Sequence, residues 1–196
     1  MKKFLVLVAL LPLALSCSND DSTPAPFFNL AEGNMWIYRR YNSDGQGQNP
    51  MPTNEIDTVR IVGQEVIDGI SYFKFTHTLD TPSYDLRVDA EGHLVNTVGH
   101  VVHPGTDTDY TATTFFDPYG TNTYALGQPD IVEIEGTAYN ILPYEGYFKP
   151  SEGYNLPEGV GDIRAYTAGI GFVIQRSRYL SSLAYFEYRL EHFELN

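Results

Sequence analysis

Short segments of alternating polarity, separated by glycine and proline turns, run through most of the chain and constrain its fold more than any other feature. No stretch keeps an apolar helical period over three turns, which argues against a helix-rich fold. The pair Asp68-Gly69 lies between the apolar runs 65–67 and 70–76, and Asp-Gly is a strong signal for a tight hairpin. Near the C-terminus, residues 184–191 alternate between one apolar and one polar face.

The sequence therefore predicts a single all-β domain of roughly 9–11 antiparallel strands. Because flat open edges promote aggregation, we expect a curled sheet or a barrel, either open or closed. The expected strands are 35–41, 57–62 leading to 65–67, 70–76, 84–88, 93–95, 111–116, 122–126, 131–134, 137–142, 170–176 and 184–191.

The first sixteen residues have the composition of an export signal. Met1-Lys2-Lys3 is positive, residues 4–15 are almost wholly apolar, and small Ser16 precedes Cys17. The apolar run is shorter than the roughly 20 residues that a membrane-spanning helix needs. We expect a signal peptide at 1–16, a polar tether at 17–26 that reaches on the order of 30 Å, and the β-rich domain at 27–196.

Cys17 is the only cysteine, so it cannot form an internal disulfide. The segment Leu13-Ala14-Leu15-Ser16-Cys17 resembles the lipobox of bacterial lipoproteins, which implies that Cys17 is acylated and becomes the mature N-terminus. The following residues 18–22 resemble the acidic sorting signal of surface lipoproteins in Bacteroidota-type bacteria. The resemblance implies an outer membrane lipoprotein that is exposed on the cell surface, or that otherwise faces the periplasm.

Three further segments resemble a family of secreted β-rich lipoproteins of Bacteroidota-type bacteria whose function is uncharacterised. They are 33–38 (Gly-Asn-Met-Trp-Ile-Tyr), 68–73 (Asp-Gly-Ile-Ser-Tyr-Phe) and 168–173 (Ala-Gly-Ile-Gly-Phe-Val). The resemblance implies a fold and a compartment, and it carries no catalytic residues to this chain.

The charge balance limits the partners of the chain. The formal net charge is −13 and becomes two units more negative when Lys2 and Lys3 leave with the signal. Nucleic acids and anionic bilayers attract basic patches, so we expect no nucleic-acid partner and attachment to the membrane through acyl chains alone. The chain has no Gly-x-Ser-x-Gly elbow and no phosphate-binding glycine motif, and we expect neither a cofactor nor catalytic residues.

Four residues near the middle of the chain are of metal-binding types, namely His100, His103, Asp107 and Asp109. Two histidines three positions apart on a strand point to opposite faces. A shared metal would therefore require a turn between them, and we favour polar residues at a hairpin end.

Residues 143–159 contain three Pro/Glu/Gly turns with aromatic residues among and beside them. We expect an ordered loop excursion on a rigid sheet, which is a common place for binding. Tyrosine rings beside carboxylates could stack on sugars and accept hydrogen bonds from their hydroxyls. The alternative is a loop whose tyrosines close one end of the barrel. The candidate ligand-binding residues are Tyr139, Tyr144, Glu145, Tyr147, Phe148, Glu152 and Tyr154.

Three functions are compatible with the sequence. The favoured one is a non-enzymatic surface lipoprotein that binds a ligand, preferably a glycan, or assists an envelope protein complex. The second is a carrier whose curved sheet encloses an apolar or lipid ligand. The third is a hydrolase without a recognised motif.

Replacing Cys17 with alanine should release the protein from membranes, because the acyl chains rather than protein charge hold it there. Membrane sedimentation of the wild type and of Cys17→Ala measures this release. A variant that still sediments with the membrane would contradict the lipid anchor.

Overall fold

The described part of this computed structural model, residues 26–79 and 82–196, forms one antiparallel sheet of thirteen strands. The all-β prediction is confirmed, with more strands than expected. The strands are β1 (Met35–Asn42), β2 (Met51–Ile67), β3 (Ile70–Thr76), β4 (Tyr84–Val88), β5 (Leu94–Asn96), β6 (Val101–His103), β7 (Thr111–Phe116), β8 (Gly120–Leu126), β9 (Asp130–Ile134), β10 (Thr137–Pro150), β11 (Gly159–Thr167), β12 (Gly171–Arg178) and β13 (Tyr185–Glu194).

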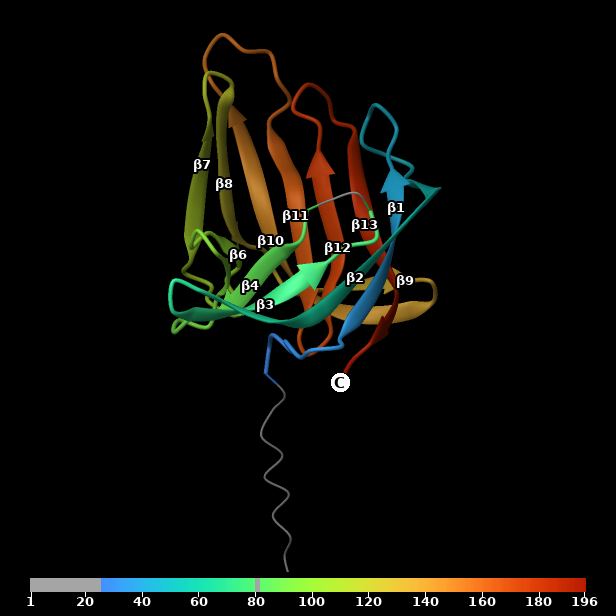
Figure 1. The fold of residues 1–196 in the computed structure, drawn as a ribbon. Coiled ribbons are helices and arrows are strands. Elements are labelled where there is room, and N and C mark those ends of the chain that lie inside the picture. The colour runs from blue at the N-terminus through green and yellow to red at the C-terminus, as the bar shows by residue number, and fades with distance from the viewer. Residues whose placement is uncertain (1–25, 80–81) are drawn as a thin grey trace, which may run out of the picture.

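The sheet curls until its two ends approach each other. Its hydrogen-bonded order is β6-β5-β4-β3-β2-β1-β13-β12-β11-β10-β8-β7, and β9 pairs with β10 beside this path. Figure 1 shows β7, β8 and β10–β13 as a tall wall, with β2–β4 crossing in front of its lower half. Within the described residues β6 and β7 end the order without pairing to each other, so the curled sheet is open at this seam.

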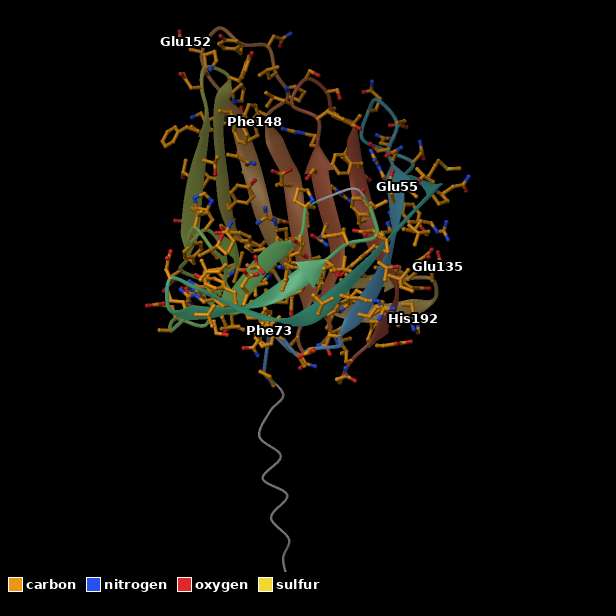
Figure 2. All side chains as sticks on the ribbon, in the orientation of Figure 1. Glu55, Phe73, Glu135, Phe148, Glu152 and His192 are labelled. Carbon is orange, nitrogen blue, oxygen red and sulfur yellow. The ribbon has the colours of Figure 1, made fainter. Side chains whose placement is uncertain are left out.

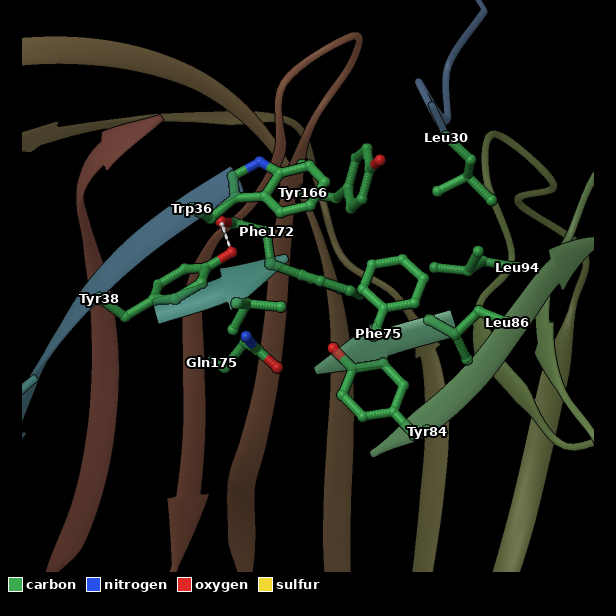
Figure 3. Close-up of a pocket in the computed structure, with 12 residues that line it drawn as sticks. Leu30, Trp36, Tyr38, Phe75, Tyr84, Leu86, Leu94, Tyr166, Phe172 and Gln175 are labelled. Carbon is green, nitrogen blue, oxygen red and sulfur yellow. Dashed lines mark hydrogen bonds between the residues drawn. The ribbon is translucent and has the colours of Figure 1, made fainter. Parts of the chain in front are cut away.

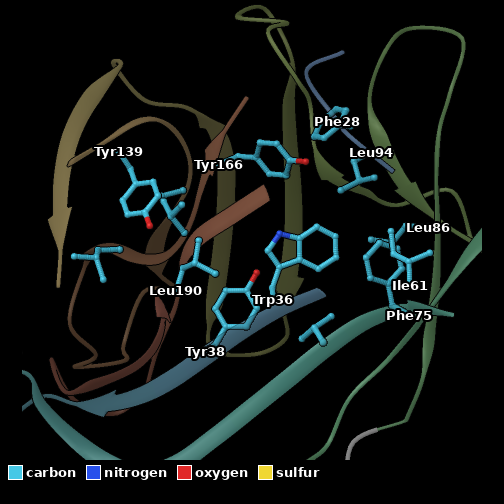
Figure 4. Close-up of a cluster of buried hydrophobic side chains, with 14 residues drawn as sticks. Phe28, Trp36, Tyr38, Ile61, Phe75, Leu86, Leu94, Tyr139, Tyr166 and Leu190 are labelled. Carbon is cyan, nitrogen blue, oxygen red and sulfur yellow. The ribbon is translucent and has the colours of Figure 1, made fainter. Parts of the chain in front are cut away.

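The core lies between the crossing strands and the lower half of the wall (Figure 4). Trp36 on β1 anchors it, because its indole packs near Phe75 of β3 and its Nε1–H donates to the carbonyl of Ile170 at 2.7 Å. The Tyr38 hydroxyl donates to the carbonyl of Phe172 at 3.0 Å. A Cβ at Gly171 would lie 2.8 Å from Trp36 Nε1, so only glycine allows this approach. The sheet thus covers its own apolar face.

The Asp68-Gly69 hairpin is confirmed. The two residues have φ values of 51° and 80°, which are the positive angles of a type I′ turn, and β2 and β3 flank them directly.

Two loop predictions are wrong. The composition of segment 42–54, rich in Gly, Asn, Gln and Pro, predicts a long loop. The segment is a loop only between Asn42 and Met51, because β2 already begins at Met51. The predicted excursion 143–159 is a strand as far as Pro150, and β11 begins at Gly159. Pro143 does not interrupt the pairing of β10 with β11, since it is paired with Ala165 within this ladder.

The face of β12 and β13 that carries Glu187 contains an ion cluster. Glu187 is fully buried, and its two carboxylate oxygens accept hydrogen bonds from Arg176 Nε at 2.8 Å and Arg189 Nε at 2.6 Å. The guanidinium of Arg176 lies 4.0 Å from the ring centre of Tyr185, and that of Arg189 lies 4.4 Å from the ring centre of Tyr41. Two arginines on neighbouring strands therefore share one carboxylate.

Glu187→Gln should lower the free energy of unfolding by about 3 kcal/mol, because it leaves two partly buried guanidinium groups without their shared counter-charge. Urea denaturation measures the change. Glu65→Gln is the matched control, since Glu65 pairs with Lys74 at 3.0 Å on the surface, where solvent screens the pair. Equal stability of the Glu187 variant and the wild type would contradict the assigned role of the cluster.

Candidate functional site

The predicted binding residues of segment 139–154 lie on opposite sides of β10 and in the loop beyond it. Tyr144 and Phe148 are buried on the inner face, whereas Tyr147 is exposed and donates its hydroxyl hydrogen to Glu158 at 2.9 Å. Glu145 is half-buried, and its side chain points to the opposite face of β10 from that of Tyr144. Because successive side chains of a strand point to opposite faces, these residues lie apart, whereas a loop could have brought them to one side.

The remaining members of that set lie at the two ends of β10. Tyr139 is buried where β10 pairs with β9. Glu152 and Tyr154 are exposed in the loop 151–158 at the upper end of β10 and β11, above Phe148 (Figure 2). The seven residues do not form the single tyrosine platform that the sequence suggested.

A row of polar and aromatic side chains crosses the inner face instead. Directly paired residues of an antiparallel sheet project to the same side. Successive pairs join Tyr144, Arg164, Gln175, Tyr188 and Arg40 across β10, β11, β12, β13 and β1. Except for Tyr144, these residues are half-buried, so the inner face changes from apolar to polar along this row.

At one end of the row a polar cavity of about 330 Å³ opens at the seam of the sheet. Val101 and Val102 of β6 lie on one side, and Ala112 and Thr113 of β7 lie on the other. The lining is completed by Asn96, Gly99, His100, Tyr110, Thr114, Tyr124, Tyr144 and Arg164. We call this space the seam cavity.

Burial raises the pKa of both tyrosine hydroxyls from the wall, Tyr124 and Tyr144, so both remain hydrogen-bond donors at neutral pH. The carboxylate of Asp162 accepts the hydroxyl of Tyr124 at 2.7 Å and the side-chain amide of Asn122 at 2.9 Å. These bonds fix Tyr124 at the edge of the seam cavity. On the other side, Asn122 and Asp162 line a second cavity of about 190 Å³ with Phe148.

The apolar interior has much less space. The cavity among Trp36, Tyr38, Phe75, Tyr166 and their neighbours measures about 30 Å³ (Figure 3). This is roughly the share of one water molecule in the liquid. The aromatic side chains fill the curled sheet in this conformation.

The metal candidates are not gathered into a site. His103 is fully buried with both ring nitrogens engaged, because Nε2 lies 3.0 Å from the carbonyl of Leu142 and Nδ1 accepts the amide of Gly105 at 3.1 Å. Asp107 lies 3.0 Å from Nε2 of His93 and caps the amide of Asp109, while His100 is exposed at the seam cavity. In the described ranges no three His, Cys, Asp or Glu residues could share a metal.

Sequence reasoning missed Arg164 and Asp162, because the β11 strand itself was not predicted. The signal was present, since Ile163 and Ala165 alternate with Asp162, Arg164 and Tyr166. Gly159 and Gly161 at its start made the segment look like a continued turn.

The predicted signal peptide, Cys17 and the predicted tether up to residue 25 lie outside the described residues. The described ranges contain no helix with the length and apolarity of a membrane span.

The fold and the seam cavity define an open, curled single-sheet protein. No protein-family model matches the chain, and no curated protein matches it. Two solved structures align with 87% of this chain and 99% of their own. One, from Parabacteroides distasonis, is described as a lipoprotein and is 11% identical with a TM-score of 0.36. The other, from Bacteroides fragilis, is described as an exported protein with a YmcC-like fold and is 14% identical with a TM-score of 0.46.

His103 should make the fold less stable in mild acid. Burial lowers its pKa from 6.5 to about 4, so the folded protein keeps it neutral while the unfolded chain takes up a proton near pH 6.5. The stabilisation is present above pH 6.5 and is lost as the pH falls toward 4. Between about pH 7.5 and about pH 5, the wild type should lose about 2 kcal/mol more than His103→Gln.

Urea denaturation at the two pH values tests this. His192→Gln, an exposed position on β13, should keep the wild-type pH dependence. If the free energy of unfolding of His103→Gln and of the wild type depends on pH in the same way, protonation of His103 is not the cause of the loss in acid.

Proposed function

We propose that this protein is a lipid-anchored lipoprotein of the outer membrane, acylated at Cys17, whose domain binds a glycan without catalysing a reaction. The lipobox resemblance, the polar tether and the acidic body support the anchor. The expected surface exposure rests on the residues that follow Cys17.

One observation carries the ligand-binding proposal, namely the polar seam cavity of about 330 Å³. Its volume lies at the lower end of the range for small-molecule sites. Such a volume suits one or two sugar units rather than a long chain buried along its length.

The chemistry of the lining favours a saccharide. Tyr110 and Tyr124 supply aromatic surface, and Thr114 and Asn96 supply a hydroxyl and an amide group. A sugar presents both an apolar ring face and a rim of hydroxyls. The aromatic side chains of the lining can contact the ring face, and its polar groups can form hydrogen bonds with the hydroxyls.

The carrier function has less support. An acyl chain needs an enclosed apolar space of hundreds of Å³, as small-molecule sites generally do. The apolar cavity measures about 30 Å³. A lipid could enter the interior of the curled sheet only after the aromatic core had rearranged.

Ala112→Trp should weaken glycan binding at least about tenfold, because it places an indole in the seam cavity. Ala138→Trp is the matched control, since Ala138 is exposed on β10 and lies opposite Glu133 of β9. The mature chain carrying Cys17→Ser would be screened on an array of neutral and acidic glycans, and the affinity for each hit would be measured by calorimetry.

Binding that both tryptophan variants retain would move the site away from the seam. An array without hits would contradict the glycan proposal. Native mass spectrometry of protein from its own host gives a second readout, because a retained acyl chain would favour the carrier instead.

A further inference from the structure

Arg164 differs from the other arginines of the row and of the ion cluster. Arg40 pairs with Glu55, and Arg176 and Arg189 pair with Glu187. Within residues 26–79 and 82–196, Arg164 has no carboxylate within ion-pair distance. Its one hydrogen bond runs from Nη1 to the carbonyl of Val102 at 3.1 Å. A guanidinium has five N–H donors, so most of its donor capacity is unused.

The position of Arg164 directs that capacity into the seam cavity. The hydrogen bond to Val102 holds the side chain across the seam, from β11 of the wall to β6 at the end of the sheet. Tyr124 lies beside it, with the guanidinium 5.8 Å from the ring centre. The lining contains no Asp or Glu, although the chain as a whole carries a net charge of −13.

Asp162, two positions before Arg164 on β11, has other partners. Asp162 faces the same side of β11 but accepts hydrogen bonds from Tyr124 and Asn122, and it lines the second cavity rather than this one. Its charge offsets part of the field of Arg164 at a distance. The local donors at the seam cavity remain the guanidinium and the hydroxyl groups.

We propose that the seam cavity takes an acidic sugar unit, with the monocarboxylate on Arg164 and the sugar hydroxyls on Thr114 and Asn96. This inference rests on the proposed glycan-binding function and specifies its ligand class. A planar guanidinium matches a carboxylate with two parallel hydrogen bonds, which a neutral sugar cannot form. Partial burial strengthens the pair, because water screens it less than on the open surface.

The array includes uronic-acid and sialic-acid glycans, which share this carboxylate chemistry and distinguish its two sources. The quantitative probe is trigalacturonate compared with its methyl ester, which has the same ring shape without the charge. Calorimetry on the mature chain carrying Cys17→Ser should show at least about tenfold tighter binding of the acid. Arg164→Gln should remove the difference between acid and ester, whereas Arg60→Gln, which removes an exposed charge from β2, should preserve it.

A second pair of variants leaves the bond between Arg164 and Val102 intact. Thr114→Asp places a carboxylate on the inner face of β7 in the lining and should abolish binding of the acid. Thr113→Asp should not, because its side chain projects to the opposite face of β7 beside Thr123. This pair remains informative if Arg164→Gln does not fold.

The outcomes separate the two proposals. Equal binding of acid and ester would overturn the acidic ligand and leave glycan binding in place. If trigalacturonate does not bind and the array hits are all neutral glycans, the acidic ligand is likewise overturned and glycan binding is kept. If the hits are sialic-acid glycans and Arg164→Gln abolishes their binding, the carboxylate site is supported. An array without any hit would overturn both proposals.

Discussion

The whole structure depends on one constraint, which is that a single sheet has to bury its own apolar face. The described residues supply no helix to cover it, so the strands at one end fold across the strands in the middle (Figure 1). Trp36 and Tyr38 fix that arrangement by donating hydrogen bonds to carbonyls of the β11–β12 turn and of β12. These two bonds also satisfy polar groups that burial would otherwise leave unpaired.

Incomplete closure follows from the same constraint. The strands shorten toward the end of the order, from 17 residues in β2 to five in β4 and three each in β5 and β6. They cover the lower half of the wall and stop before β6 can pair with β7. Polar side chains occupy the part of the inner face that the cover does not reach. The seam cavity and the polar row therefore lie where no further strand covers the inner face of the sheet.

The strand pattern could be predicted from the sequence because it is local. β4 and β7 were predicted to the residue, and the Asp68-Gly69 turn followed from backbone preferences alone. The candidate site could not be predicted in the same way. Arg164 is 62 positions from Val102 in the sequence and meets it only through the curl of the sheet. The prolines and glycines of 143–159 suggested a loop, but strand pairing with β8 and β11 overrode them.

The pairing of the first strand with the last has a kinetic consequence. β1 is hydrogen bonded to β13 in the middle of the sheet, and the amide of Asn196 donates to the side chain of Asn34 across 162 positions of sequence. Such distant contacts make folding slow, because a large loop must close before its contacts form. A nascent chain cannot complete its central ladder until its last residues are available. The strand order thus leaves the central ladder open until β13 has been synthesised, which suits the proposed export, because a translocation pore accepts an unfolded polypeptide.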